Sequence, residues 1–483
     1  MNVILFTIDS LRYDRCSVNG HFRNTTPNLS SLAEEGIVFN KAYATGPFTS
    51  ESFPGMLAGQ HSYNGGYYHN IKWKALTEED RTLATWLDDE GYDTAAVISN
   101  LHLTKRRNFD AGFNHYDNLR AEKDGLLDAN DEEPADENDD GGGGLIQLGD
   151  VLYKIRSQMR QWTGAANPFI PALVAYRYYQ LGDWATVPGE DVVNRFIDVL
   201  DGLDEPFLAW THLMDVHGPL HPGRINEAGL DWPARRQFVA DAQQLSNRLT
   251  PDHHVRYDYS VRYEDLQLGR LIDWLQREGL WDETIIIVTA DHGAALYDHD
   301  FYGHPPHYPF EESLHVPLVV RIPDCAGKRI SDPFSLAWLG ELIAECLNID
   351  SPSFPIESGV ESHLTDDGTG GQPLVADSIS SEGHTVVVYD DEWKYARHYG
   401  NLTHDWTTVA TPDLADALQT TGIGYELRSD PSEYNPIYKG ERVRELIQTS
   451  ERIQTDPGNL QAIGGSFSSG VEDRLKQLGY VID

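Results

Sequence analysis

Apolar segments alternate with amphipathic ones along the chain, and this pattern predicts a sheet of buried strands separated by helices. The segments at 2–9, 206–213 and 284–291 are short apolar runs, as in strands that are covered on both faces of a sheet. The segment at 25–36 opens with Thr-Thr-Pro and closes with Gly36, which marks both ends of a helix. This alternation favours an α/β fold with helices on both faces of the sheet.

The same alternation continues to about residue 345. Further strands are predicted at 37–44, 92–100 and 315–323, and further helices at 82–91, 192–203 and 257–279. Beyond residue 345 the pattern changes to a hairpin at 385–401 followed by an amphipathic end. We therefore expect a large domain over 1–345 and a smaller C-terminal α+β subdomain over 346–483, with antiparallel strands and a terminal helix.

One internal segment departs from this pattern. Residues 120–146 are acidic, rich in glycine and almost free of apolar side chains. A segment of this composition buries too little apolar surface to offset the entropy of folding. We interpret it as a solvated insertion in the large domain.

The charge and cysteine content narrow the class of protein. The 483 residues include 76 Asp and Glu against 37 Lys and Arg, a net charge of −39, which disfavours nucleic acid and anionic membranes as partners. Such a surface is typical of proteins from very salty cytosols, and the chain resembles halophilic, haloarchaeal proteins in this respect. Three cysteines, no signal-like leader and no run long enough to span a membrane predict a cytoplasmic protein. The oligomeric state is not predicted.

Two carboxylates stand where predicted strands end. Asp9 follows the first strand, and Asp291, followed at once by His292 and Gly293, ends the strand at 284–291. A single Asp in this position is often only a helix cap or a turn former. Taken together, Asp9, Asp291 and His292 form an O,O,N set that suits a divalent cation at one edge of the sheet.

Histidines gather in two segments that follow strands. The first contains His212, Asp215, His217 and His221, and the second contains His299, His304 and His307. They are either surface histidines of an acidic protein or donors that bind an anionic group or a second metal ion. The sequence leaves both interpretations open.

These motifs, taken in order, resemble the sulfatase family of the alkaline phosphatase superfamily. The resemblance rests on NVILFTIDSLRYD, TPNLSSLAEEG, the hydroxyl-rich segment ending in MLAG, LWDETIIIVTADHG, YGH and HVPLVV, and on WKYARHY and YELRSDPSEYNPIY near the end. It implies a three-layer αβα fold around a mixed sheet, as in alkaline phosphatase, and a divalent metal ion.

The resemblance also identifies the nucleophile position. Sulfatases carry a Cys or Ser there, at the first position of a Cys-x-Pro-x-Arg pattern. This Cys or Ser is oxidised to formylglycine. Counting back from Gly59 places Thr49 at that position, with Glu51 and Phe53 in place of Pro and Arg. Ser50 and Ser52 are out of register.

A second family motif is also altered. The family's sulfate-binding Lys is replaced by Asn100, whereas His102 of the same motif is retained. Thr49 is therefore similar to the plain Thr of phosphoglycerol transferases and phosphoester hydrolases in the superfamily.

The resulting hypothesis is a two-step reaction. Thr49, bound to the metal on Asp9, Asp291 and His292, attacks phosphorus or sulfur, and water or an alcohol resolves the covalent ester. The resemblance implies that His217 and His304 contact the leaving group and the anion, and that His102 lies nearby. Asp215 and His221 would be extra ligands if a second metal ion binds. The competing interpretation of Thr49 is a helix N-cap, which is compatible with an anion site.

The predicted function is hydrolysis or transfer of a sulfate or phosphate ester of a small molecule or glycan, with phosphorus favoured because Thr49 replaces the oxidisable residue. The alternatives are a sulfuric ester hydrolase without formylglycine and a non-catalytic member that binds anionic glycans. The metal is Mn, Zn, Mg or Ca, and His292 favours the first three.

Overall fold

The computed structural model describes residues 1–65, 67–69, 73–77, 79–123, 186–218, 220–221, 224–230, 251–352, 354–355, 374–402, 412–455 and 461–463. The helix α5 (Leu119–Lys123) occupies the start of the acidic segment, so the predicted insertion at 120–146 begins too early. The rest of that insertion and the predicted terminal helix lie outside the described residues.

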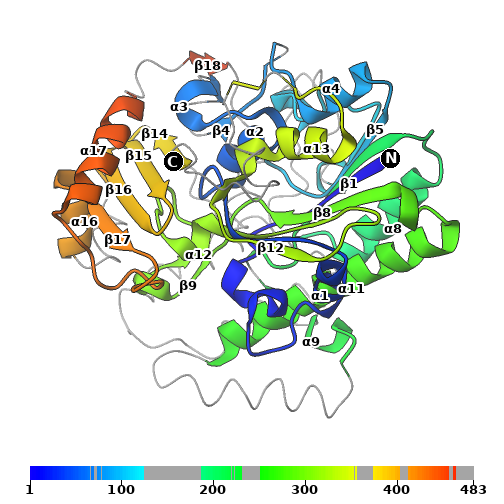
Figure 1. Ribbon diagram of the computed structural model, residues 1–483, viewed down its shortest axis with the longest axis horizontal. Helices are drawn as coiled ribbons and strands as arrows, with labels where there is room; N and C mark the ends of the chain where they lie inside the picture. The colour runs from blue at the N-terminus through cyan, green and yellow to red at the C-terminus, as the bar shows by residue number, and fades with distance from the viewer. Residues whose placement is uncertain are drawn as a thin grey trace, which may run out of the picture.

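A mixed sheet forms the centre of the large domain, as predicted (Figure 1). Its strands are β1 (Asn2–Ile8), β2 (Gly36–Tyr43), β5 (Asp93–Ile98), β6 (His115–Asn118), β7 (Phe207–Leu213), β8 (Thr284–Ala290), β11 (His315–Arg321), β12 (Lys328–Ile330) and β13 (Phe334–Ser335). Their order is β12-β2-β11-β8-β1-β7-β5-β6, and β13 pairs with β2. The strands β8, β1, β7, β5 and β6 are parallel, whereas β11 is antiparallel to both neighbours.

Helices cover both faces of this sheet (Figure 1). One face carries α1 (Pro27–Glu34), α8 (Gly189–Leu200) and α11 (Pro251–Glu278), and the other carries α2 (Thr49–Ala58), α4 (Leu83–Asp89) and α13 (Leu339–Leu347). The three-layer arrangement confirms the predicted fold class. Among the described residues, no helix combines the length and apolar character needed to cross a bilayer.

Several short elements connect the layers. They are α3 (Ser62–Gly65), α9 (Arg224–Glu227), α12 (Glu311–Leu314), β3 (Tyr67–His69), β4 (Trp73–Lys74), β9 (Ala295–Leu296), β10 (Tyr302–Gly303) and β18 (Gln461–Ile463). The pair β9 and β10 forms a small antiparallel ribbon that follows β8 along the chain. This ribbon carries the second histidine segment.

A second sheet lies beside the large domain (Figure 1). It is fully antiparallel, in the order β14 (Leu374–Ser380), β15 (Gly383–Asp390), β16 (Trp393–Gly400) and β17 (Ile423–Glu426), with α16 (Pro412–Thr420) and α17 (Glu441–Ile453) packed on it. The predicted hairpin at 385–401 is confirmed as β15 and β16. The proposed domain boundary at residue 345 stays a prediction.

The register of the parallel strands decides where the functional residues meet. Ile8 at the end of β1 pairs with Ala290 of β8 on one side and with Leu213 of β7 on the other. The residues that follow these three strands therefore leave the sheet at the same edge. Open α/β sheets bind their ligands at the carboxyl ends of such strands.

Candidate metal and nucleophile site

Asp9 and Asp291 meet at this edge of the sheet, and both side chains are fully buried. Asp9 accepts hydrogen bonds from Ser10 Oγ at 2.7 Å and from Asn100 Nδ2 at 3.0 Å. Asp291 Oδ1 accepts from the backbone N–H of Ser10 at 3.2 Å and of His292 at 2.9 Å. The structure thus brings together two carboxylates that are 282 positions apart along the chain.

Ser10 joins the two carboxylates through an uncommon backbone conformation. Its φ of 60° lies in the left-handed region, which residues other than Gly, Asn and Asp seldom adopt. Tyr257 holds this turn in place, because its hydroxyl donates to Ser10 O at 2.6 Å. The turn directs the Ser10 N–H at Asp291 while the Ser10 hydroxyl faces Asp9. The strained conformation of Ser10 therefore holds the two carboxylates in position.

Thr49 projects into the same group from the start of α2. Its Oγ1 lies 3.3 Å from His292 Nε2 and 3.5 Å from Asp9 Oδ2. The N-cap of α2 is Phe48, and Thr49 is the first residue of the helix with no capping hydrogen bond from a side chain. The competing interpretation of Thr49 as an N-cap is therefore wrong, because its hydroxyl points to the carboxylates and not back to the helix.

Tight packing fixes the position of α2. Every residue of the helix is buried, and a β-carbon on Gly55 would stand 2.2 Å from Thr45 Oγ1. The helix ends at Gly59, whose φ of 62° is the left-handed conformation that glycine favours. The Gly-flanked segment that includes Thr49 is thus a rigid helix start.

His292 presents an unprotonated nitrogen to Thr49. Its Nδ1 lies 2.8 Å from Gly293 O, and because a carbonyl only accepts, Nδ1 carries the proton. The lone pair on Nε2 then faces Thr49, with Asp291 Oδ2 at 3.5 Å. Burial lowers the pKa of His292, which keeps the ring neutral and able to bind a cation.

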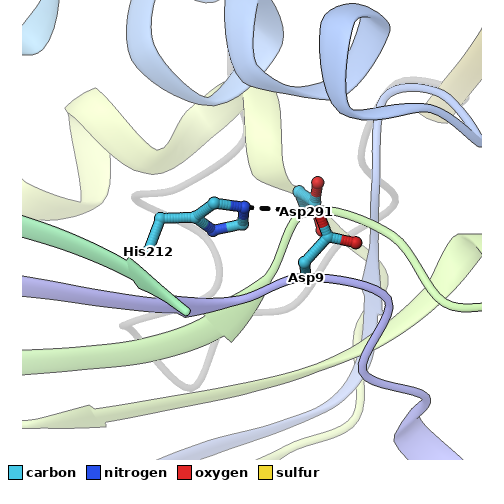
Figure 2. A group of neighbouring side chains, drawn as sticks. All are labelled: Asp9, His212 and Asp291. Atoms are coloured by element: carbon cyan, nitrogen blue, oxygen red, sulfur yellow. Dashed lines mark ion pairs between the residues drawn. The ribbon is translucent and has the colours of Figure 1, made fainter. Parts of the chain in front are cut away.

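His212 is a further member of the site that the sequence analysis did not assign to the metal. The carboxylates of Asp9 and Asp291 and one nitrogen of His212 lie within 4.8 Å of one another, and all three side chains are buried. Figure 2 shows the imidazole of His212 pointing at the two carboxylates, and Nε2 lies 3.4 Å from Asp9 Oδ2.

A chain of hydrogen bonds fixes the tautomer of His212. Thr7 Oγ1 donates to Thr211 O at 2.9 Å and accepts from Trp210 Nε1 at 3.0 Å. Since the Thr7 hydroxyl proton is already used, His212 Nδ1 at 2.9 Å must be the donor, and the lone pair of a neutral ring is on Nε2. That nitrogen faces Asp9.

The two carboxylates hold different amounts of charge. Burial alone raises the pKa of Asp9, but His217, His212 and His292 keep this pKa well below its usual value. Burial together with the charge of Asp9 raises the pKa of Asp291 to about 8. At neutral pH the pair therefore holds one proton and one negative charge.

The residues present fit a divalent cation. Two carboxylates, the hydroxyl of Thr49 and the bare nitrogens of His292 and His212 converge, and such a mixed O,N set suits Mn, Zn or Mg better than Ca. The raised pKa of Asp291 has its cause in burial and in the negative charge of Asp9, so the pair lacks positive charge. A bound cation would displace that proton and let both carboxylates ionise.

His217 and His304 form a second pair beside this group. Their Nε2 atoms are 2.8 Å apart, and the rings of His292 and His304 have centroids 4.6 Å apart. His217 Nδ1 lies 2.6 Å from Gly218 O, so His217 Nε2 accepts and His304 Nε2 donates. Burial lowers the pKa of His217, and burial with the nearby His292 and His217 lowers the pKa of His304 well below its usual value.

The altered family motif lies against the same site. Asn100 Nδ2 donates to Asp9 and lies 3.4 Å from His212 Nε2, so an amide faces the carboxylate where the family places a Lys. His102 is fully buried with its ring 6.0 Å from that of Phe48, and Phe48 is 5.0 Å from His304. Burial followed by the charge of Arg107 lowers the pKa of His102 well below its usual value.

Asp215 belongs to a different cluster. Its carboxylate accepts from Gly189 N at 2.6 Å and from Arg224 Nε at 2.6 Å, and its own N–H donates to Glu264. His221 is half-buried, and its backbone O accepts from Arg224 N. The structure therefore brings together Asp9, Thr49, Asp291 and His292, but it directs Asp215 to an arginine, away from the metal group.

The chain belongs to the sulfatase family, whose sequence profile matches residues 1–346, and it is therefore an ester hydrolase. This confirms the resemblance at the level of the family. The altered nucleophile segment lies within the matched region.

Particular relatives include both sulfatases and a phosphorus-ester enzyme. An N-acetylglucosamine-6-O-sulfatase of Bacteroides thetaiotaomicron is 24% identical over 94% of this chain and 86% of the relative. The human iduronate 2-sulfatase is 26% identical over 75% of this chain and 66% of the relative. The structure of the phosphonate monoester hydrolase of Agrobacterium radiobacter has the same fold, with a TM-score of 0.61, 19% identity and 94% coverage of both chains.

Proposed function

We propose that this protein cleaves a singly charged sulfate or phosphate ester with Thr49 as its nucleophile and a divalent cation held by Asp9, Asp291 and His292. The observation that carries the proposal is the position of Thr49 Oγ1, within 3.5 Å of both Asp9 Oδ2 and His292 Nε2. A hydroxyl in this position at the start of a helix is placed to attack an anionic centre.

The surroundings of Thr49 favour a plain hydroxyl over formylglycine. Oxidation of a Thr side chain, a secondary alcohol, gives a ketone and not an aldehyde. Of the two primary alcohols nearby, Ser50 and Ser52, the second donates its hydroxyl to Asp291 O at 2.5 Å and so faces the strand end. Phe53, at the position of the family's Arg, packs edge-on against the His212 ring at 4.9 Å. These contacts support a site built for an unmodified Thr49.

The proposed reaction has two steps. When bound, a divalent cation supplies positive charge that favours the ionised Thr49 hydroxyl and attracts the anionic ester. Thr49 Oγ1 forms a bond to phosphorus or sulfur, and the bond from that atom to the leaving oxygen breaks. His304 Nε2–H, which donates to His217 in the structure, is the proposed proton donor to that oxygen. Water then cleaves the covalent ester and regenerates Thr49.

The charge of the site supports a substrate with one negative charge. Within the described part of the chain, no Lys or Arg forms an ion pair with Asp9 or Asp291, and Asn100 stands in place of the family's Lys. Diesters of phosphate, monoesters of phosphonate and monoesters of sulfate each carry a single charge. Both chemistries occur in the names of the relatives, which is why the proposal covers both, with phosphorus favoured by Thr49.

The covalent ester on Thr49 gives the direct test. The protein is incubated with Mn²⁺ and, separately, with a 4-nitrophenyl phosphodiester and 4-nitrophenyl sulfate, quenched in acid and digested for mass spectrometry. We expect a phosphoryl or sulfuryl group on the peptide containing Thr49, and its loss in Thr49→Ala. Thr49→Ser should restore both adduct and turnover in part. Turnover by Thr49→Ala at the native rate would exclude this mechanism.

A further inference from the structure

A series of side chains in contact connects the buried catalytic group to partly exposed residues. Asp9, Thr49, Asp291 and His292 are fully buried, whereas His304, Gly303 and Gly218 are partly exposed. Contacts run outward without a break: Thr49 Oγ1 faces His292, the His292 ring contacts that of His304, and His304 bonds to His217, which precedes Gly218. Because His304 is the proposed proton donor to the leaving oxygen, the alcohol part of an ester bound at Thr49 would lie on the side of His304, towards Gly218 and Gly303.

Tyr302 stands at the outer end of this series. It belongs to β10 and precedes His304 by two residues, and 43% of its surface is exposed. Tyr302 is thus a solvent-facing aromatic surface next to both histidines of the site.

Two further rings support Tyr302. The ring of Tyr297 lies 5.1 Å from it at an interplanar angle of 35°, and that of His253 lies 5.4 Å from it at 66°. The rings of His253 and Tyr297 also contact each other at 5.5 Å. Packing of this kind fixes the orientation of an exposed ring, so a ligand that stacks on it has less entropy to lose.

The backbone beside Tyr302 leaves room for a ligand. A β-carbon on Gly218 would meet Tyr302 Oη at 3.8 Å and no other described atom within 4 Å, apart from its chain neighbours. A β-carbon on Gly303 would meet no described atom within that distance. Gly303 has a φ of 86°, which favours glycine, whereas no such constraint is found at Gly218. The backbone conformation at Gly218 would accept a side chain, so the absence of one there leaves space beside the Tyr302 ring without serving the backbone.

The local charge limits what this space accepts. Asp300 lies two residues before Tyr302 on the same ribbon, and the whole chain carries a net charge of −39, whereas the charge of Asp298 is balanced by an ion pair with Arg12 at 2.6 Å. A second anionic group near Tyr302 would be repelled, most strongly at low salt. An uncharged ring meets no such repulsion and gains contact with the aromatic face.

We propose that Tyr302, supported by Tyr297 and His253, forms a leaving-group subsite that binds an uncharged ring over the open backbone of Gly218 and Gly303. The inference rests on the proposed function, because the ring belongs to the alcohol of the ester that Thr49 attacks. Two kinds of ring share the required chemistry: the C–H face of a pyranose and the face of an aryl group.

The test compares leaving groups on one reacting centre. The probes are three methyl phosphodiesters, whose second alcohol is the 6-hydroxyl of glucose, 4-nitrophenol or ring-free trifluoroethanol, and the three matching sulfate esters. Native protein is compared with Tyr302→Ala, Tyr302→Phe and, as a control for loss of an exposed tyrosine elsewhere, Tyr438→Ala, which removes a ring that is 47% exposed.

We expect Tyr302→Ala to lower kcat/KM about tenfold for a ring-bearing ester, the value of one aromatic stacking contact, and to leave the trifluoroethyl ester unchanged. Tyr302→Phe and Tyr438→Ala should keep native values. A loss confined to the glucose ester or to the aryl ester supports the subsite and identifies its ring. Gly218→Val, which fills the space, should reproduce the selective loss.

Other outcomes overturn the inference. An equal loss for the ring-free ester would mean that Tyr302 only supports the loop, and unchanged values for every ester would mean that nothing stacks there. If the native protein cleaves none of the probes, the proposed function fails, and saturation-transfer NMR with glucose 6-sulfate tests the subsite separately. Transfer to the pyranose protons that disappears in Tyr302→Ala supports it, and transfer that is absent or unchanged overturns it.

Discussion

The clusters of carboxylate and imidazole groups around Asp9 and around Asp377 are both buried, but they balance their charge in different ways. At the edge of the central sheet, Asp9 and Asp291 face each other, and the pKa of Asp291 is raised to about 8 by burial and by Asp9. Asp377 lies where α3 and the loop before it meet the antiparallel sheet, and hydrogen-bond donors surround this single carboxylate. Its Oδ1 accepts from Ser62 N at 3.0 Å, and its Oδ2 lies 3.0 Å from His384 Nε2.

The cluster around Asp377 is complete without a ligand. Thr455 N donates to His384 Nδ1 at 3.0 Å, so the proton of a neutral His384 is on Nε2 and points at Asp377. His61 Nδ1 lies 3.6 Å from the same carboxylate. Burial alone would raise the pKa of Asp377, but the hydrogen bond from His384 and the nearby ring of His61 hold that pKa well below its usual value.

The difference separates a structural cluster from a functional one. Asp377 links the antiparallel sheet to the large domain, and its charge is stabilised by residues of this chain alone. Asp9 and Asp291 have too little positive charge beside them, and a bound cation would supply it. Substitutions in the first cluster should therefore change stability, and substitutions in the second should change cation binding and turnover.

The largest effect is expected for Asp9→Asn. Because Asp9 contacts both Thr49 and the second carboxylate, its loss should lower kcat/KM by about 10³-fold or more and weaken binding of Mn²⁺. Steady-state kinetics and calorimetric titration measure the two effects. In the presence of a chelator, the melting temperature should be close to that of the native protein, and a large drop would mean that Asp9 is structural.

Asp377→Asn should produce the opposite pattern. Removing one partner of a buried, hydrogen-bonded pair lowers the free energy of unfolding by about 3 kcal/mol. Urea unfolding measures this loss, and calorimetry should show native affinity for Mn²⁺. A variant with native stability but weakened cation binding would remove the distinction between the two clusters.

His212→Gln tests the member of the site that only the structure revealed. Whether His212 binds the cation or orients Asp9, its replacement should lower cation affinity about 10–100-fold. Trp210→Phe removes the donor to Thr7 Oγ1 while keeping the aromatic ring, and it should give a smaller loss in the same direction. Unchanged affinity in His212→Gln would assign the ring to packing alone.

The pH dependence of stability should also differ between the clusters in the metal-free protein. The folded pKa of Asp291 lies above the unfolded value near 3.8, so the folded state binds the extra proton between about pH 4 and 8. Stability from this group is therefore present at low pH and falls as pH rises, by at most about 1.4 kcal/mol per pH unit. The folded pKa of Asp377 is lowered, so its contribution is lost as pH falls below about 4.

Urea unfolding at several pH values, with chelator present, measures these slopes. In Asp291→Asn the decline between pH 4 and 8 should disappear, and saturating Mn²⁺ should suppress it in the native protein. A native slope that persists in Asp291→Asn would assign the decline to other groups.

Much of the fold could be predicted because apolar periodicity reports burial directly. The runs that form β1, β7 and β8 are buried on both faces, and β15 and β16 are two strand-forming runs on either side of a short acidic turn. The start of the acidic insertion was misplaced because polar composition does not exclude a short helix such as α5. Short strands such as β6 and β9 carry too few residues to show a period.

The site could be predicted only in part. Asp9, Asp291 and His292 follow strands and carry a recognisable signal, and Thr49 was found through the family resemblance. His212 lies within a strand, where a polar residue among apolar ones gives no sign of its partners, although its place near the carboxyl end of β7 is a usable signal. Asp215 has the same sequence signal as Asp291, but only the structure shows that Arg224 and Gly189 satisfy it.

The sequence by itself determined the strands and helices, the residue types available for chemistry and the excess of negative charge, because these depend on local composition and spacing. The tertiary structure decided which of those residues meet, since the order β8-β1-β7 and its register place Asp291, Asp9 and His212 side by side. It also decided their protonation, because the pKa of a carboxyl group depends on burial and on neighbours that lie far away along the chain.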